Sequence, residues 1–80
     1  MKITAIAANQ TELYLEDGII VFFSYNTPVC VFAPGKGALV TTAKYSKTTT
    51  AHINKTLERW NCSFTFVNQD IIDNYIGRKE

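Results

Sequence analysis

The spacing of apolar residues changes between residues 45 and 60, and this change constrains the fold more than any other feature of the sequence. In the segments before it, apolar residues alternate with a period of about two, as in β-strands. Within it, Ile53, Leu57 and Trp60 lie four and three residues apart, which places them on one face of a helix. The sequence therefore predicts one main helix packed on a sheet formed by the residues that precede it.

Hydroxyl side chains before this helix can cap the free amide groups of its first turn. Ser46 and each threonine of the run 48–50 are candidates. We choose Thr48, because a helix over residues 49–60 then has about three turns, near the average length. Asn61 follows directly and can adopt the left-handed conformation that ends a helix.

The same stretch holds the densest cluster of positive charge in the chain. His52, Lys55 and Arg59 lie three and four residues apart and share a second helix face. A solvated surface is one interpretation of this face, and a surface that binds an anion or a protein partner is the other. On the second interpretation the predicted partner-binding residues are Lys44, Tyr45, Lys47, His52, Lys55 and Arg59.

Strands are predicted on both sides of the main helix. Residues 2–8 alternate weakly, and residues 12–16 alternate cleanly, with Leu13 on one face and Glu12 and Tyr14 on the other. Asp17 and Gly18 predict a tight hairpin turn. The next segments, 19–25 and 29–33, are apolar on both faces, which is typical of central strands. Residues 38–43 and 63–67 complete the set.

The weakly alternating residues 2–8 are not counted in the predicted order, which is β-β-β-β-α-β-α, an α+β fold. It consists of an antiparallel meander of four strands, the main helix, a fifth strand and a short C-terminal helix over residues 70–76 that Gly77 ends. Both helices are expected on one face of the sheet. The chain of 80 residues forms a single domain, 1–80.

One helix of about three turns cannot cover both faces of a sheet whose central strands are apolar on both sides. Phe22, Phe32 and Tyr14 are the residues expected on the uncovered face. A homodimer is our preferred explanation, because symmetric dimers are the commonest oligomers. The alternative is a strongly curved sheet closed by its own side chains.

Composition excludes several classes of protein. A net charge of +1 disfavours both an acidic mimic of DNA and a strongly basic nucleic-acid binder. No apolar run approaches the ~20 residues that span a membrane, and no signal peptide is recognisable. Cys30 and Cys62 form no Cys-x-x-Cys motif, so we expect reduced thiols and a cytoplasmic protein, with a single bridge as the alternative.

Catalytic residues are not predicted. His52 is the only histidine, and no carboxylate is placed near it in sequence to orient it. The turn around Gly35 and Gly37 lacks the Gly-Lys-Ser/Thr ending of a phosphate loop. A lone histidine without nearby ligands makes a poor metal site. We therefore expect no enzyme activity, no metal and no cofactor.

Two segments resemble a family of small tailed-phage proteins catalogued only as a domain of unknown function. Residues 23–29 are similar to its Phe-Ser-Tyr-x-Thr-Pro-Val motif, and residues 44–54 to its Lys-Tyr-Ser-x-Thr-Thr-x-x-His-Ile-Asn motif. Cys30 stands where that family more often has alanine. The resemblance implies a phage gene product that acts in the host cytoplasm.

Phage accessory proteins of this size commonly act by binding, so the resemblance favours a non-enzymatic interaction protein. Its partner would be a host or phage protein, and inhibition of a bacterial defence such as CRISPR is the activity expected. The alternative is a nucleic-acid-binding accessory protein that uses the basic helix face, with Tyr25 or Tyr45 stacking on a base.

Overall fold

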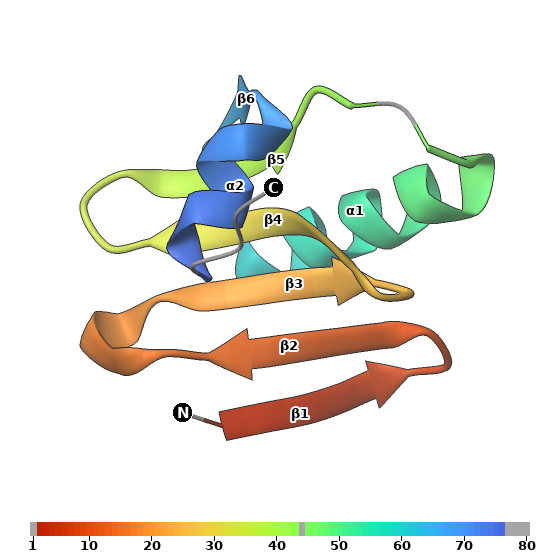
Figure 1. Ribbon diagram of the computed structural model, residues 1–80, viewed down its shortest axis with the longest axis horizontal. Helices are drawn as coiled ribbons and strands as arrows, with labels where there is room; N and C mark the ends of the chain where they lie inside the picture. The colour runs from red at the N-terminus through yellow and green to blue at the C-terminus, as the bar shows by residue number, and fades with distance from the viewer. Residues whose placement is uncertain (1, 44, 77–80) are drawn as a thin grey trace.

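The computed structural model describes residues 2–43 and 45–76. The protein has an α+β fold (Figure 1). Its single mixed sheet has six strands, arranged side by side as β1-β2-β3-β4-β5-β6. The strands are β1 (Lys2–Ala7), β2 (Gln10–Tyr14), β3 (Ile20–Ser24), β4 (Thr27–Ala33), β5 (Gly37–Thr41) and β6 (Phe64–Val67). The helices are α1 (Lys47–Trp60) and α2 (Gln69–Tyr75), and a short 3-10 turn, η1, covers Glu16–Gly18.

The predicted fold class is confirmed, with one strand more than the predicted order. Residues 2–7 pair with β2 and extend the meander to five antiparallel strands. β6 then pairs with β5 in parallel. A parallel neighbour needs a long crossover connection, and α1 supplies it. The approach of β6 also depends on Gly37, where an added Cβ would lie 3.0 Å from the carbonyl oxygen of Ser63.

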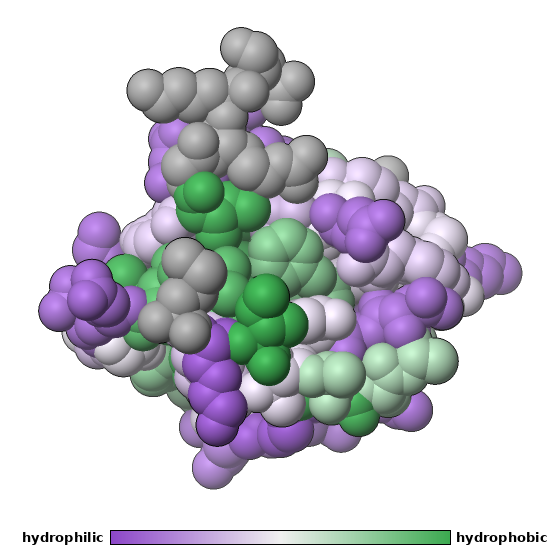
Figure 2. Space-filling view, turned by 60° about the horizontal axis from the view of Figure 1, so that its bottom comes forward, coloured by the Kyte–Doolittle hydropathy of each residue, from purple (hydrophilic) through white to green (hydrophobic). Residues whose placement is uncertain are grey.

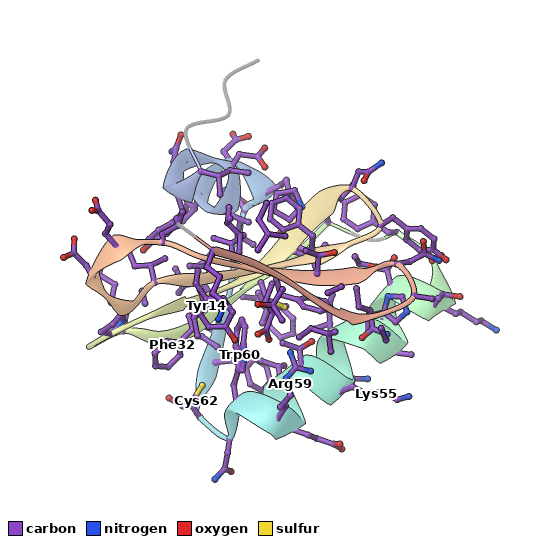
Figure 3. The ribbon with its side chains drawn as sticks, turned by 90° about the horizontal axis from the view of Figure 1, so that it is seen from below. Tyr14, Phe32, Lys55, Arg59, Trp60 and Cys62 are labelled. Carbon is purple, nitrogen blue, oxygen red and sulfur yellow. The ribbon has the colours of Figure 1, made fainter. Side chains whose placement is uncertain are left out.

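The two helices lie on opposite faces of the sheet, which corrects the expectation that both lie on one (Figure 3). Ile53, Leu57 and Trp60 of α1 pack against one core cluster, as their spacing predicts. That cluster consists of Phe22, Val29, Cys30 and Val40. Ile72 of α2 packs on the other face with Val21, Val31 and Leu39.

This arrangement explains why β3 and β4 are apolar on both sides: each face has its own helix. The residues expected on an uncovered face are therefore accounted for differently. Phe22 is fully buried. Phe32 packs edge-on against the ring of Trp60, with 6.1 Å between centroids. Tyr14 is half-exposed and donates a hydrogen bond to Glu12.

Helix α1 begins earlier than predicted, and its cap is Ser46 rather than Thr48. The backbone of Ser46 is extended, and its side-chain hydroxyl accepts a hydrogen bond from the Thr49 amide at 3.1 Å. Asn61 ends the helix in the left-handed conformation, as predicted. A hairpin at Asp17 is confirmed, because β2 and β3 pair antiparallel. The predicted tight two-residue turn is wrong: the strands end at Tyr14 and resume at Ile20, and the connection contains η1. Gly77 lies outside the described residues.

Both cysteines are free thiols, as expected. Cys30 is buried under α1, and burial raises the pKa of its thiol to about 12. No helix in residues 2–43 and 45–76 is long and apolar enough to cross a membrane.

Candidate functional site

The residues predicted to form one basic surface do not act together: several of them contact different parts of the protein. Lys44 lies outside the described residues. The hydroxyl of Tyr45 donates a hydrogen bond of 3.0 Å to Oε1 of Gln69, the first residue of α2. Lys47 and Lys55 are exposed on α1, and Lys55 lies on the outer side of the helix (Figure 3).

His52 points toward the sheet, where it meets a chain of hydroxyl groups. Its Nδ1 lies 2.8 Å from Oγ of Ser24, the last residue of β3. Ser24 in turn donates to Oγ1 of Thr49 at 3.2 Å, and Ser46 donates to the same oxygen at 3.3 Å. The ring of Tyr25 lies beside the imidazole, with 6.0 Å between centroids.

This chain of contacts ties the first turns of α1 to the end of β3. Ser24 is buried, and the neighbours of its hydroxyl group are another hydroxyl and the imidazole. A nucleophilic serine needs access to substrate and a base that is itself oriented by a third group. The arrangement therefore positions the helix rather than presenting a nucleophile.

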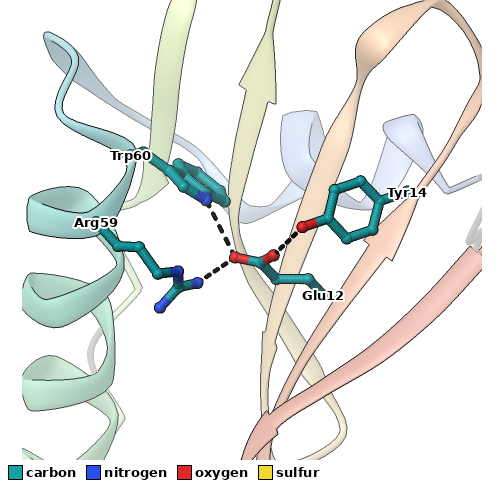
Figure 4. A network of polar contacts seen from close by, with 4 residues as sticks. All are labelled: Glu12, Tyr14, Arg59 and Trp60. Atoms are coloured by element: carbon teal, nitrogen blue, oxygen red, sulfur yellow. Dashed lines mark hydrogen bonds and ion pairs between the residues drawn. The ribbon is translucent and has the colours of Figure 1, made fainter.

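Arg59 is not available on the predicted basic face, because it forms an ion pair with the buried carboxylate of Glu12 (Figure 4). Glu12 of β2 is only 2% exposed, and three groups donate to it. Tyr14 donates to Oε1 at 2.6 Å, and Trp60 Nε1 donates to Oε2 at 3.1 Å. Arg59 also donates to Oε2. Strand alternation placed Glu12 on a solvent face, but the last turn of α1 covers it.

The electrostatics of Glu12 are a balance between burial and hydrogen bonding. Burial alone raises the pKa of its carboxyl group, but the hydrogen bonds from Tyr14, Arg59 and Trp60 and the charge of Arg59 outweigh burial and hold that pKa below its ordinary value. The hydrogen bond to Glu12 raises the pKa of Tyr14, with smaller contributions from burial and from the carboxylate charge. Glu12 is therefore ionised at neutral pH and acts as the anchor for the end of α1.

An apolar groove lies between α1 and β6, and sequence reasoning did not find it. It has a volume of about 340 Å³. Phe64 and Phe66 of β6 form its outer wall, with their rings edge to face at 5.5 Å between centroids. They are 47% and 62% exposed, because α1 crosses the sheet without covering β6. Ile53 and Leu57 form the opposite wall.

The alternation of residues 63–67 could have indicated this site. It predicts that Phe64 and Phe66 share a face, and the predicted main helix is too narrow to cover every strand of a sheet. The missing information was the position of β6 at the edge, which follows from its parallel pairing with β5.

A smaller hollow of about 240 Å³ lies over β1, β2 and β3, near the opposite edge of the sheet from β6. Ile3 of β1, Leu13 and Phe23 line it together with Tyr25. Ile3 is 69% exposed. Figure 2 shows hydrophobic side chains gathered in the middle of the side of the molecule that carries β1. The structure therefore has exposed apolar surface at both ends of the sheet.

Metal ligands do not gather in the described part of the chain, where no group of three or more histidine, cysteine, aspartate or glutamate side chains could hold an ion. The chemistry that the described surfaces offer is apolar contact at the groove and the hollow, with separate exposed lysines on α1.

Comparison with protein families finds one model that matches residues 1–74, and its description is a family of unknown function, DUF8033. The chain belongs to the DUF8033 family. Searches of curated proteins and of solved structures find no significant match. Membership of DUF8033 thus agrees with the uncharacterised family expected from the sequence, and it assigns no activity.

In this DUF8033 protein the two segments that carry the sequence resemblance meet in space. Ser24 lies in the first segment, and Thr49 and His52 lie in the second. Their hydrogen bonds join residues that are 25 and 28 positions apart. The local pattern could not reveal this contact, because it depends on how α1 crosses the sheet. It gives His52 and Thr49 a role in holding the fold together.

Proposed function

We propose that this protein is a non-enzymatic protein-binding module whose working surface is the groove between α1 and β6. The observation that carries the proposal is the exposed pair Phe64 and Phe66 beside a hollow of about 340 Å³. Exposed aromatic residues next to a concave apolar surface are typical of binding sites, because their burial drives association.

The lining of the groove favours the apolar face of an amphipathic helix as the bound element. Its floor and walls are apolar and come from Val40, Ile53, Leu57 and the two phenylalanines. Its remaining lining residues are neutral: Thr41, Thr42, Ala43, Thr50 and Asn54. A helix laid in such a groove would bury its apolar side chains and leave its polar side in water.

Binding rather than catalysis is supported by the surroundings of the single imidazole. His52 bonds to Ser24, and that serine is buried beneath α1. A general base must reach the proton that it removes from a bound substrate. Here the near nitrogen of the imidazole is occupied by a structural hydroxyl.

The finer proposal is that the protein is encoded by a phage, acts in the host cytoplasm, and inhibits a bacterial defence such as a CRISPR complex. Its support is the resemblance of residues 23–29 and 44–54 to tailed-phage proteins. The partner would then be a host protein that presents a helix to the groove.

Nucleic-acid binding by the basic face of α1 stays the alternative prediction. Lys47 and Lys55 are exposed and could meet phosphates. Arg59, however, is engaged with Glu12. A protein that neutralises several phosphates loses affinity steeply as salt rises, so salt dependence distinguishes this alternative.

The test is capture of partners from a bacterial lysate, with and without nuclease treatment, followed by mass spectrometry and by calorimetry with the purified partner. The groove variant is Phe66→Ser, and the matched control is Ile3→Ser, which removes an equally exposed apolar side chain from the opposite edge. Lys55→Ala tests the basic face. We expect wild type, Ile3→Ser and Lys55→Ala to bind the same protein and Phe66→Ser to bind it at least tenfold more weakly, about 1.4 kcal/mol.

Equal binding by Phe66→Ser and wild type would refute the groove as the working surface. Loss with Ile3→Ser alone would move that surface to the hollow beside β1. Nuclease-sensitive capture that weakens with Lys55→Ala and with salt would establish the nucleic-acid alternative.

A further inference from the structure

The two edges of the sheet are protected to different degrees. An exposed edge strand offers unpaired backbone groups to other strands, and proteins blunt such edges with charged residues and bulges. β1 carries Lys2, and its pairing with β2 has a bulge between Ala5 and Ala7. β6 pairs regularly with β5, and residues 61–69 carry no charged side chain.

The hydrogen bonds to β5 show which backbone groups of β6 face outward. The carbonyls of Ser63 and Val67 accept from the amides of Ala38 and Thr42, at 3.0 and 2.8 Å. Backbone groups of alternate residues point to opposite sides of a strand. Residues 63, 65 and 67 therefore face β5, and Phe64 and Phe66 direct their amide and carbonyl groups to the open edge.

We propose that two copies of this chain pair through β6, antiparallel, about a two-fold axis at Thr65. In this register Phe64 lies opposite the partner's Phe66, and Phe66 lies opposite the partner's Phe64. Both are pairs of the kind in which two residues exchange both of their N–H···O bonds. Every outward backbone group of the strand is then used, and the two sheets become one.

Other registers use the edge less completely. An axis at Phe64 or at Phe66 pairs that residue with its own copy and places the other opposite a residue outside the strand. A shift by one residue sets outward groups against residues 63, 65 or 67, whose groups already face β5. The axis at Thr65 is therefore the register in which the four-residue strand complements itself.

The side chains suit the same register. Phe64 and Phe66 both lie on the α1 face, so cross-strand pairing brings aromatic rings together across the axis. Thr65 lies on the other face, opposite the partner's Thr65. Because residues 61–69 are uncharged, no like charges oppose one another when the strand pairs with a second copy of itself. The register that uses every outward group of β6 is thus also free of charge repulsion, which favours a second copy as the occupant of this edge.

The inference does not depend on the proposed protein partner. Phe64 and Phe66 contribute to both surfaces, but the dimer is tested at Thr65, which does not line the groove between β6 and α1. The α1 face of the joined sheet would carry two such grooves on either side of the central phenylalanines.

The experiment is sedimentation equilibrium of the full chain over a range of concentrations. We expect wild type to approach twice the 9.0 kDa of one chain as concentration rises. Thr65→Lys places two like charges opposite each other at the axis and should weaken association at least tenfold. Thr65→Glu should do the same, and an equimolar mixture of the two variants should associate again, because opposite charges then meet.

Ala5→Lys is the matched control, because it adds the same charge to an exposed residue of the other edge strand, β1. It should leave the dissociation constant of the dimer unchanged. Circular dichroism and thermal melts establish that each variant is folded, and Thr65 is exposed, so its substitution leaves the core intact.

Wild type that stays a monomer at the highest attainable concentration would overturn the proposal. So would a folded Thr65→Lys variant that dimerises like wild type, or a mixture of the charged variants that fails to associate. Dissociation by Ala5→Lys alone would place the interface at β1. None of these outcomes affects partner capture by Phe66 in the groove, so the two proposals fail separately.

Discussion

Replacement of Glu12 by glutamine tests the anchor between β2 and the end of α1. The substitution keeps the shape of the side chain but removes its charge and replaces one acceptor oxygen with an NH₂ group. Tyr14, Arg59 and Trp60 all donate to the carboxylate in the wild type. The NH₂ group of the glutamine is a donor, so it cannot accept a hydrogen bond from at least one of these three residues.

The cost follows from the number and kind of contacts. A hydrogen bond to a charged group contributes about 1.5–3 kcal/mol, and a buried donor left unpaired costs about 1–3 kcal/mol. Arg59 is partly exposed, so its contribution is screened by water. We therefore expect Glu12→Gln to lower the free energy of unfolding by about 3 kcal/mol at pH 7. For a domain with a total stability of about 5 kcal/mol this is a large fraction.

The pH dependence provides a second measurement. The folded-state pKa of Glu12 lies below its ordinary value, so the folded state binds fewer protons than the unfolded state. Its stabilisation is fully present above the unfolded-state pKa of about 4.3 and is lost as pH falls through the lower folded-state pKa. Glu12→Gln should remove this part of the acid dependence.

Urea unfolding followed by the fluorescence of Trp60, the only tryptophan, measures both effects. Glu16→Gln is the matched control, because Glu16 is an exposed carboxylate in η1, and its substitution should change stability by less than about 0.5 kcal/mol. A Glu12→Gln variant as stable as the Glu16→Gln control, with an unchanged acid dependence, would refute the anchor.

Two further predictions concern hydroxyl groups of α1. Ser46→Ala should lower stability by about 1 kcal/mol because it removes the helix cap, whereas Thr48→Ala, at an exposed position outside the cap, should change it little; a larger loss for Thr48→Ala in urea unfolding would contradict the assignment. Thr56 is fully buried, and among the described residues its Oγ1 has no hydrogen-bond partner, so Thr56→Val should raise stability by about 1 kcal/mol. Thr49→Val is the contrast at the second buried threonine of α1, since its hydroxyl bonds to Ser24 and Ser46; thermal melts should show it destabilised, and equal effects at both positions would contradict the difference in bonding.

The sequence was sufficient for the features that depend on local period. The spacing of Ile53, Leu57 and Trp60 predicts the apolar face of α1, and those residues pack on the core. The runs that form β3 and β4 predict strands covered on both sides, and both sides are covered. Asn61 predicts the end of the helix, because few residues other than glycine adopt its backbone conformation readily.

Features that depend on contacts between distant segments could not be predicted. The location of α2 on the second face follows from the packing of Ile72, and nothing in a seven-residue helix indicates which face it will cover. Glu12 lies at an alternating position that is typical of a solvent face, yet Arg59 and Trp60 reach it from 47 and 48 residues away. The contact of His52 with Ser24 has the same origin.

Each face of the sheet is covered by its own helix, so the exposed apolar surface lies at the two edge strands rather than on the faces. Phe22, which was expected to need a partner, is buried by α1. Among the described residues, the two most exposed large apolar side chains are instead Ile3 of β1 and Phe66 of β6, at the two edges of the sheet. The end at β1 has a lysine and a bulge that hinder strand pairing, and the end at β6 has neither. Association of this protein is therefore expected at β6, through contacts that strand alternation indicates and that the parallel pairing of β6 with β5 places at an open edge.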